Sequence, residues 1–358
     1  MPETKSLEPC AANGGTQSGK PPSVSVLVPT YDRAGYLGAS LRSVLDQTFS
    51  DLEVVVVDDG STDGTADVLA RIADPRLRVV RQPHAGCAAA LNGGLAVARG
   101  RYIARNDSDD VWLPNLLSEL VPVLEANPAL GLVYGRCQGM RADGAPSGAT
   151  RGLPLRYPHD PFRSLLYADY TASIATVYRR SCLDLVGAYD ATLVHSEDWD
   201  LVLRVARVFP VAFVDRVLAR IRAHPGNATA LGAVSTPARI KDRETVLDKV
   251  FARSDLAPAA WAMKPIAYRN VHIGNALQWW SISEYRRAGH SLAAALRSGA
   301  NPAGTLLRAA LSFGGWFGLS RYVATARLGH ALLRWSRGCR RMPPARSPGP
   351  GQQSLGSA

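Results

Sequence analysis

The sequence predicts an α/β fold: a doubly wound, mostly parallel sheet with helices on both faces, followed by an α-helical C-terminal extension. Three observations support this prediction. Short continuous apolar runs, typical of strands that are buried on both faces, recur in the first third of the chain. Segments with apolar residues at helical spacing separate these runs. Beyond Leu231 a helical pattern continues to about Gly338.

Strands and helices alternate along the N-terminal part of the chain. The first strand is expected at 24–28 (VSVLV), and the helix after it carries four apolar residues on one face, Leu37, Leu41, Val44 and Leu45. Further strands are expected at 53–57, 77–80 and 101–105, with helices at 64–73 and 86–98. Sheets of this kind bind ligands at the carboxyl ends of their strands, so a site is expected where these strands end.

The pattern is weaker after these elements. Residues 139–172 are rich in glycine and proline, and we expect a loop over the sheet edge. A strand is expected within 173–180, a helix at 196–209, and two short strands at 211–215 and 217–224. The predicted domains are a disordered leader at 1–22, the α/β domain at 23–230, a helical region at 231–340 and a disordered tail at 341–358.

Composition places the chain among globular proteins. Apolar residues make up 46%, and the net charge is +11. The five cysteines show no C-x-x-C spacing, so we expect reduced thiols and no sulfur-ligated metal. The N-terminal residues lack the apolar core of a signal peptide, and no uncharged apolar run reaches the roughly 18 residues that a transmembrane helix needs. We therefore expect a cytoplasmic protein.

Three aspartates follow the strand at 101–105 within the stretch NDSDD: Asp107, Asp109 and Asp110. Carboxylates this close repel one another, so water, a cation or a cation-bearing ligand must offset the repulsion. The D-x-D spacing sends Asp107 and Asp109 to the same side of an extended segment. Their oxygens suit Mg²⁺ or Mn²⁺, whose coordination shells substrate phosphates commonly complete. The alternative is a solvated acidic turn, and the position at a strand end favours the metal.

Two other strand ends carry groups that suit a nucleobase. Tyr31, in PTYDRAG, can lie flat on a base, or it can pack on the next helix. Asp59, in DDGSTDGT, can accept an N–H from a uracil- or thymine-like edge. The alternative for this second stretch is a turn with a helix N-cap supplied by Ser61, Thr62 or Asp63. The stretch can serve both functions, because Asp59 can bind the base while one of the later residues caps the helix.

Two common nucleotide-binding patterns are missing. No G-x-G-x-x-G follows the first strand, which disfavours a dinucleotide-dependent dehydrogenase. No glycine-rich loop with lysine is present, which disfavours a P-loop NTPase.

The order of these motifs, with SEDWDLVLRV (Ser196 to Val205) after them, resembles family 2 glycosyltransferases with the GT-A fold over roughly residues 23–229. The resemblance implies an inverting transfer of a sugar from a nucleotide donor. It implies base-binding roles for Pro29, Tyr31 and Asp59, a D-x-D at Asp107 and Asp109, and a catalytic base at Asp198. His224 resembles the histidine that some GT-A enzymes use near the metal, so the expected metal ligands are Asp109, Asp107 and His224. The alternative for His224 is a structural role in the loop at the end of its strand. One departure is Ala90-Leu91-Asn92, where the family often has A-R-N, so a basic contact to the donor is missing or supplied elsewhere.

The chemistry agrees with the residue types. Inverting transfer needs one carboxylate that takes the proton of the attacking hydroxyl, which Asp198 can do. A divalent cation, Mn²⁺ or Mg²⁺, stabilises the departing nucleoside diphosphate. The alternative for Asp198 is a helix-dipole role in the first turn of its helix. Alternatives for the whole protein are a nucleotidyltransferase, which would need a Gly- and Arg-rich loop after the first strand, and a non-catalytic nucleotide-sugar-binding module, which would lack the distal carboxylate.

We expect a UDP-sugar donor, with dTDP- and GDP-sugars as alternatives, a saccharide or lipid-linked acceptor, and no nucleic-acid partner. The pathway expected is the synthesis of cell-surface polysaccharide or glycolipid. Residues 306–341 interleave arginine with apolar and aromatic side chains and contain no acid. Such a segment suits the surface of an anionic membrane, which places the enzyme at the inner face of the plasma membrane. The alternative is that these helices only pack on the catalytic domain.

Overall fold

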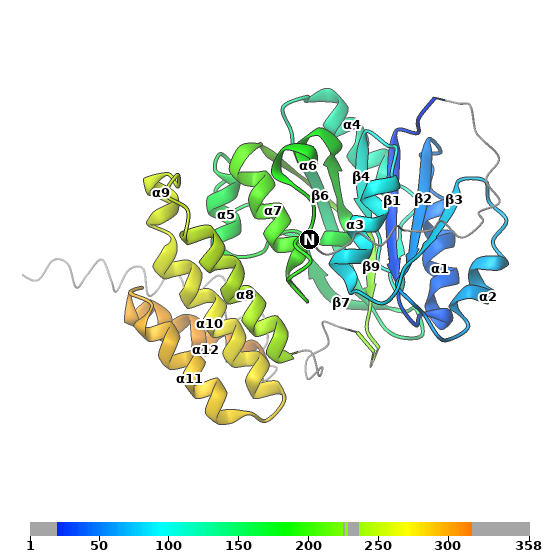
Figure 1. The fold of residues 1–358 in the computed structure, drawn as a ribbon. Coiled ribbons are helices and arrows are strands. Elements are labelled where there is room, and N and C mark those ends of the chain that lie inside the picture. Colours follow the sequence, from blue (N-terminus) through cyan, green and yellow to red (C-terminus); the bar gives the residue numbers. More distant parts are fainter. Residues whose placement is uncertain (1–19, 225, 228–235, 317–358) are drawn as a thin grey trace, which may run out of the picture. The chain divides into compact units, whose positions relative to one another are not determined.

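Four parallel strands, each predicted from an apolar run in the sequence, form one half of the sheet (Figure 1). Their spatial order is β3-β2-β1-β4, and their bounds are β1 (Val24–Thr30), β2 (Leu52–Asp58), β3 (Leu77–Arg81) and β4 (Tyr102–Arg105). In the computed structural model Thr30 lies opposite Asp58, and Asp58 lies opposite Arg81. These strands therefore end along one edge of the sheet, as their apolar runs predict.

Helices cover both faces of this half, which confirms the predicted fold class. They are α1 (Ala34–Leu45), α2 (Thr65–Ala70) and α3 (Cys87–Val97). Val26 packs in one core cluster with Leu41 of α1, whereas its neighbour Leu27 packs in the other with Leu91 of α3. Gly94 lets α3 approach the sheet closely, because a Cβ there would lie 3.2 Å from the side chain of Leu27.

The second half of the sheet mixes parallel and antiparallel pairs. β8 (Thr176–Arg179) runs antiparallel between β4 and β6 (Leu132–Met140), and β9 (Val211–Arg222) runs parallel to β6. Two further strands pair antiparallel with this half: β5 (Val111–Trp112) with β9, and β7 (Pro146–Arg151) with β6. The helices of this half are α4 (Leu116–Ala126), α5 (Pro161–Tyr167), a 3₁₀ turn (Ser173–Ala175), α6 (Arg180–Val186) and α7 (Glu197–Val208).

Two local predictions are wrong. The two short strands expected at 211–215 and 217–224 are one strand, β9, because a register shift opposite Tyr134–Arg136 lets it continue past the irregularity. The loop expected at 139–172 contains β7 and α5. The sequence of β7, PSGATR, has no strand pattern of its own and pairs only because β6 offers an open edge.

The structure describes residues 20–224, 226–227 and 236–316, and it divides into two compact units, up to Asn301 and from Pro302. The tail and all but the last three residues of the predicted leader lie outside the described residues. The first unit includes four C-terminal helices, α8 (Thr236–Phe251), α9 (Pro258–Trp261), α10 (Lys264–Ser281) and α11 (Tyr285–Arg297). Met263 and Ala267 share a core cluster with Trp199 of α7, so these helices pack on the α/β part.

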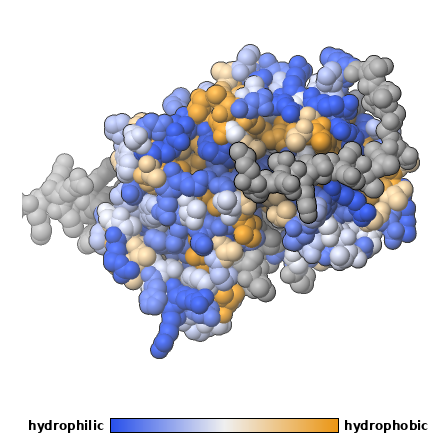
Figure 2. Space-filling model, in the orientation of Figure 1, coloured by the Kyte–Doolittle hydropathy of each residue, from blue (hydrophilic) through white to orange (hydrophobic). Residues whose placement is uncertain are grey.

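The described part of the second unit is α12 (Pro302–Trp316). Among the described residues, no helix is both long enough and apolar enough to cross a membrane. On the face drawn in Figure 2, hydrophilic side chains cover much of the surface, with hydrophobic ones visible between them. Exposed hydrophobic side chains such as Leu185, Val208 and Trp280 belong to different helices, which is ordinary for a folded protein.

Candidate active site

The ends of β1 and β2 bring an aromatic pair and a buried carboxylate together. Pro29 is buried in β1 opposite Val57, and Tyr31 follows the strand with a side chain that is 41% exposed. The ring of Tyr31 stacks on that of His84, with centroids 4.0 Å apart. One aromatic surface next to a strand end is therefore available to a flat ligand.

Asp59 organises the loop that carries His84. Its Oδ1 accepts hydrogen bonds from Gln82 Nε2 at 2.7 Å and from the backbone N–H of Ala85 at 2.9 Å. Its Oδ2 accepts one from the backbone N–H of Gly86 at 2.9 Å and lies 2.9 Å from His84 Nδ1. The carboxylate thus fixes the wall against which Tyr31 stacks, and the turn there requires glycine because Gly86 has φ +93°.

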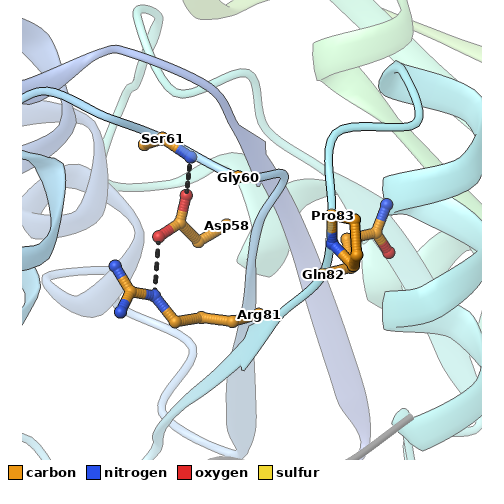
Figure 3. Close-up of a pocket in the computed structure, with 6 residues that line it drawn as sticks. All are labelled: Asp58, Gly60, Ser61, Arg81, Gln82 and Pro83. Atoms are coloured by element: carbon orange, nitrogen blue, oxygen red, sulfur yellow. Dashed lines mark hydrogen bonds and ion pairs between the residues drawn. The ribbon is translucent and has the colours of Figure 1, made fainter. Parts of the chain in front are cut away.

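Asp58 points into a separate hollow beside this loop (Figure 3). Its Oδ1 accepts the backbone N–H of Ser61, and its Oδ2 pairs with Arg81 Nε, both at 3.0 Å. The hollow has a volume of about 380 Å³, within the range of small-ligand pockets, and its lining is Asp58, Gly60, Ser61, Arg81, Gln82 and Pro83. A hollow with both charged and apolar lining residues therefore adjoins the aromatic pair at the same sheet edge.

Asp107 is held by the arginine that precedes it. Arg105 Nε donates to Asp107 Oδ1 at 2.7 Å, and Arg105 Nη1 donates to Glu197 Oε1 at 2.8 Å. Burial raises the pKa of Asp107, and Asp109 raises it further by repulsion, while Arg105 opposes both effects. One buried guanidinium therefore neutralises part of the acidic cluster and ties it to α7.

Asp109 faces two other cationic or polar groups. Its Oδ2 lies 3.0 Å from His224 Nε2 and 3.4 Å from Arg33 Nε. His224 itself is buried and stacks on the ring of Tyr36, with centroids 4.4 Å apart. The structure thus brings together Asp109 and His224, which the sequence separates by 115 positions.

Asp110, the third acid of the cluster, has a structural role. Its Oδ1 accepts the backbone N–H of Arg222 at 2.8 Å, at the end of β9. Burial raises the pKa of Asp110 well above its usual range, and Asp107 and Asp109 add to that effect. This bond fixes the acidic turn to the strand that carries His224.

Three side chains at this corner carry oxygen or nitrogen donors of the kind that a divalent cation could use. Asp109 and His224 are in contact, and burial and the charge of Asp109 raise the pKa of Asp107. Across the described ranges, no group of three or more His, Cys, Asp or Glu side chains has metal-binding geometry. Asp109, His224 and Asp107 remain the residues that could contribute to a cation site, as the sequence predicts.

Asp198 lies in the first turn of α7, after Ser196 in a left-handed conformation (φ +64°). Its Oδ1 accepts the backbone N–H of Trp199 at 2.8 Å. The residue before it, Glu197, is the partner of Arg105 described above. The expected base therefore sits one residue from a direct connection to the D-x-D segment.

Sequence reasoning missed four residues of the site: Arg33, His84, Arg105 and Glu197. Arg105 carried a signal, since a charged residue inside the buried run YIAR needs a buried partner. Leu91, the departure noted in the sequence, is fully buried in the core, so it makes no polar contact. Asn92 beside it exchanges two hydrogen bonds with the backbone of Tyr189, and this holds the segment before α7 in place.

Comparison with known proteins points to glycosyltransferases. Residues 25–185 match the model of the family described as glycosyl transferase family 2. An uncharacterized glycosyltransferase from Nostoc sp. is 39% identical over 114 residues, which is 31% of this chain and 35% of the relative. Chondroitin synthase from Pasteurella multocida is 29% identical over 192 residues, 52% of this chain and 19% of the relative. The matched segments thus span about a third or less of these relatives.

Two solved structures share the fold. A mannosyltransferase from Pyrobaculum calidifontis, in complex with GDP-Man and Mn²⁺, superposes with a TM-score of 0.55 at 24% identity, covering 84% of this chain and 82% of its own. TarS residues 1–349 from S. aureus, in complex with UDP-GlcNAc, give a TM-score of 0.56 at 20% identity, covering 76% and 83%. At these identities the likeness establishes the fold.

Proposed function

The chain belongs to glycosyl transferase family 2, and from this premise we propose that it is a metal-dependent, inverting enzyme that transfers a sugar from a UDP-sugar to a hydroxyl group. The observation that carries the proposal is the pair of salt bridges that Arg105 forms with Asp107 and Glu197. It joins Asp107 of the D-x-D to Glu197, the neighbour of Asp198, which supports a proton acceptor near the proposed cation corner. An enzyme of this class needs both in one site.

Donor binding follows from the strand ends. The base lies on Tyr31 within the wall that Asp59 and His84 shape, and Asp59 is the predicted partner of a base N–H. The two similar structures were solved with GDP-Man and UDP-GlcNAc, which supports a nucleotide-sugar donor for this fold. The choice of UDP rests on the uracil-like edge that a carboxylate acceptor selects.

Asp109 and His224, with Asp107 next to them, would hold Mn²⁺ or Mg²⁺. When bound, the ion would stabilise the negative charge on the departing diphosphate. Arg33, whose Nε lies 3.4 Å from Asp109 and whose Nη2 donates to the carbonyl of Gly226 at 2.9 Å, closes the same corner. Asp198 takes the proton from the acceptor hydroxyl as that oxygen attacks the anomeric carbon.

A panel of nucleotide sugars with Mn²⁺ tests the proposal, with release of nucleoside diphosphate as the signal. Water accepts sugar slowly in such enzymes, so the donor is identifiable without an acceptor. We expect release from a UDP-sugar, and loss of that release with EDTA. No release from any donor in the panel would contradict the proposed activity.

We further propose that the enzyme works in the cytoplasm at the inner face of the plasma membrane, on a saccharide or lipid-linked acceptor. The support is the composition of residues 306–341, which carry arginine and aromatic side chains without any acid. Most of this segment lies outside the described residues. Synthesis of cell-surface polysaccharide or glycolipid is the pathway class that fits this position.

A further inference from the structure

The side chain of His84 contacts both of the groups that the proposed function assigns to the donor base. Its ring stacks on that of Tyr31, with centroids 4.0 Å apart and an angle of 25° between the two planes. Its Nδ1 lies 2.9 Å from Asp59 Oδ2. Because one side chain reaches both groups, the face of Tyr31 that it covers is the face next to the carboxylate. The place proposed for the base therefore already holds an aromatic ring of the protein.

Hydrogen-bond donors also fill the Asp59 carboxylate, which offers about four lone-pair sites. Oδ1 accepts from Gln82 Nε2 and from the backbone N–H of Ala85. Oδ2 accepts from the backbone N–H of Gly86 and faces His84 Nδ1. This Nδ1 also lies 3.2 Å from the backbone carbonyl oxygen of Asp59, so it is a donor between two acceptors. Asp59 is only 3% exposed, and a base N–H can bind it only in place of one of these four groups.

His84 is the group whose movement opens the whole place. The two backbone N–H groups belong to a closely packed loop, since a Cβ at Gly60 would lie 2.9 Å from the backbone nitrogen of His84. The side chain of His84 is 54% exposed and can rotate into solvent while that backbone stays in place. Loss of the Gln82 bond would free one oxygen of Asp59 but would leave Tyr31 covered. Rotation of His84 uncovers both contacts at once.

We propose that the His84 ring occupies the nucleobase site of the free enzyme and that the base of the donor displaces it. The inference rests on the proposed function and identifies a residue that sets the affinity for the donor. A base that replaces His84 must supply a flat ring to Tyr31 and a ring N–H to Asp59. Uracil, thymine and guanine have such an N–H in a nucleotide, whereas cytosine and adenine lack it.

The affinity of UDP for His84→Ala tests the inference, measured by calorimetry in the presence of Mn²⁺. We expect UDP to bind about fivefold or more tightly to this variant than to the wild type, because a stacked pair and a hydrogen bond no longer compete with the base. His84→Phe keeps a ring over Tyr31, so it should lack this gain. His290→Ala, which removes an exposed histidine from α11, is the control and should bind UDP as the wild type does.

The proton signals of the His84 ring report its position directly. Protons that lie over the face of a tyrosine ring resonate upfield, and the spectrum of His84→Ala identifies which signals belong to His84. Saturating UDP with Mg²⁺, which is diamagnetic, should move these signals downfield as the ring leaves Tyr31. This measurement needs no substitution in the protein that binds UDP.

Two results would overturn the inference and leave the proposed function standing: UDP binding to His84→Ala that is no tighter than to the wild type, and His84 signals that stay in place at saturating UDP. An equal gain of affinity in His84→Phe would also overturn it, because the ring would then not be the competitor. A wild type that neither binds UDP nor releases nucleoside diphosphate from any donor would contradict the proposed function and this inference with it.

Discussion

Arg105 Nη1 lies 2.8 Å from Glu197 Oε1, and this bond joins the end of β4 to the start of α7 across 92 positions of sequence. Both side chains are buried, at 9% and 7% exposed. The same guanidinium donates to Asp107. One side chain therefore links the predicted metal corner to the helix that carries the predicted base.

Removing that side chain should destabilise the protein strongly. Arg105→Gln leaves Glu197 and Asp107 without their cation, and breaking a buried pair typically costs about 3–5 kcal/mol. Arg216→Gln is the control, because its pair with Glu119 is exposed and is worth roughly 0–1 kcal/mol. Urea unfolding measures both. An equal loss of unfolding free energy in the two variants would show that the Arg105 pairs contribute no more to stability than an exposed ion pair does.

Asp109 should be required for metal-dependent nucleotide binding. Asp109→Ala removes the carboxylate that contacts His224, so UDP affinity should lose its response to Mn²⁺ and EDTA. Thermal unfolding should change little, since the Asp110 carboxylate and the Asp109 backbone carbonyl still bond to Arg222 of β9 in this variant. Asp143→Ala, in an exposed turn, is the matched control. If UDP binding to Asp109→Ala remained sensitive to EDTA, Asp109 would be ruled out as a metal ligand.

Sequence alone predicts this corner in part. The apolar runs place Tyr31, Asp59 and Asp107 at one sheet edge because parallel strands must end there together. No pattern in the sequence specifies which side chains then pair, since Arg105 with Glu197 and Asp109 with His224 meet only through the order of β4, β8, β6 and β9. The strand β7 was unpredictable for the same reason, because it exists through its neighbour.

Asp169 should give stability a measurable pH dependence. Desolvation, with repulsion from Asp198, raises its pKa to about 6 from the usual 3.8. A carboxyl whose folded pKa is raised holds its proton longer in the folded state, so stability falls as pH rises from about 4 to about 6. Asp169→Asn removes this slope and keeps the acceptor for Thr171. Urea unfolding across that range should show the wild type losing stability relative to the variant, and a constant difference would contradict the raised pKa.

The C-terminal segment should bind anionic membranes. Arginines would draw residues 306–341 to phospholipid head groups while aromatic side chains enter the interface. The protein should sediment with anionic liposomes at low salt, dissociate as salt rises, and lose binding when truncated before Leu306. Neutral liposomes are the control. Protein that stays in the supernatant with anionic liposomes at low salt would leave these residues without a membrane role.

The central claim, that Asp198 is the general base, is tested most directly by the turnover of Asp198→Asn with saturating donor and acceptor. Asparagine keeps the size and the acceptor for the Trp199 N–H but takes no proton. Positioned proton transfer is typically worth about 10²–10⁴-fold, so kcat should fall by that order while UDP binding persists. A variant with near wild-type kcat would contradict this claim and would leave Asp198 with only the helix-dipole role in the first turn of α7.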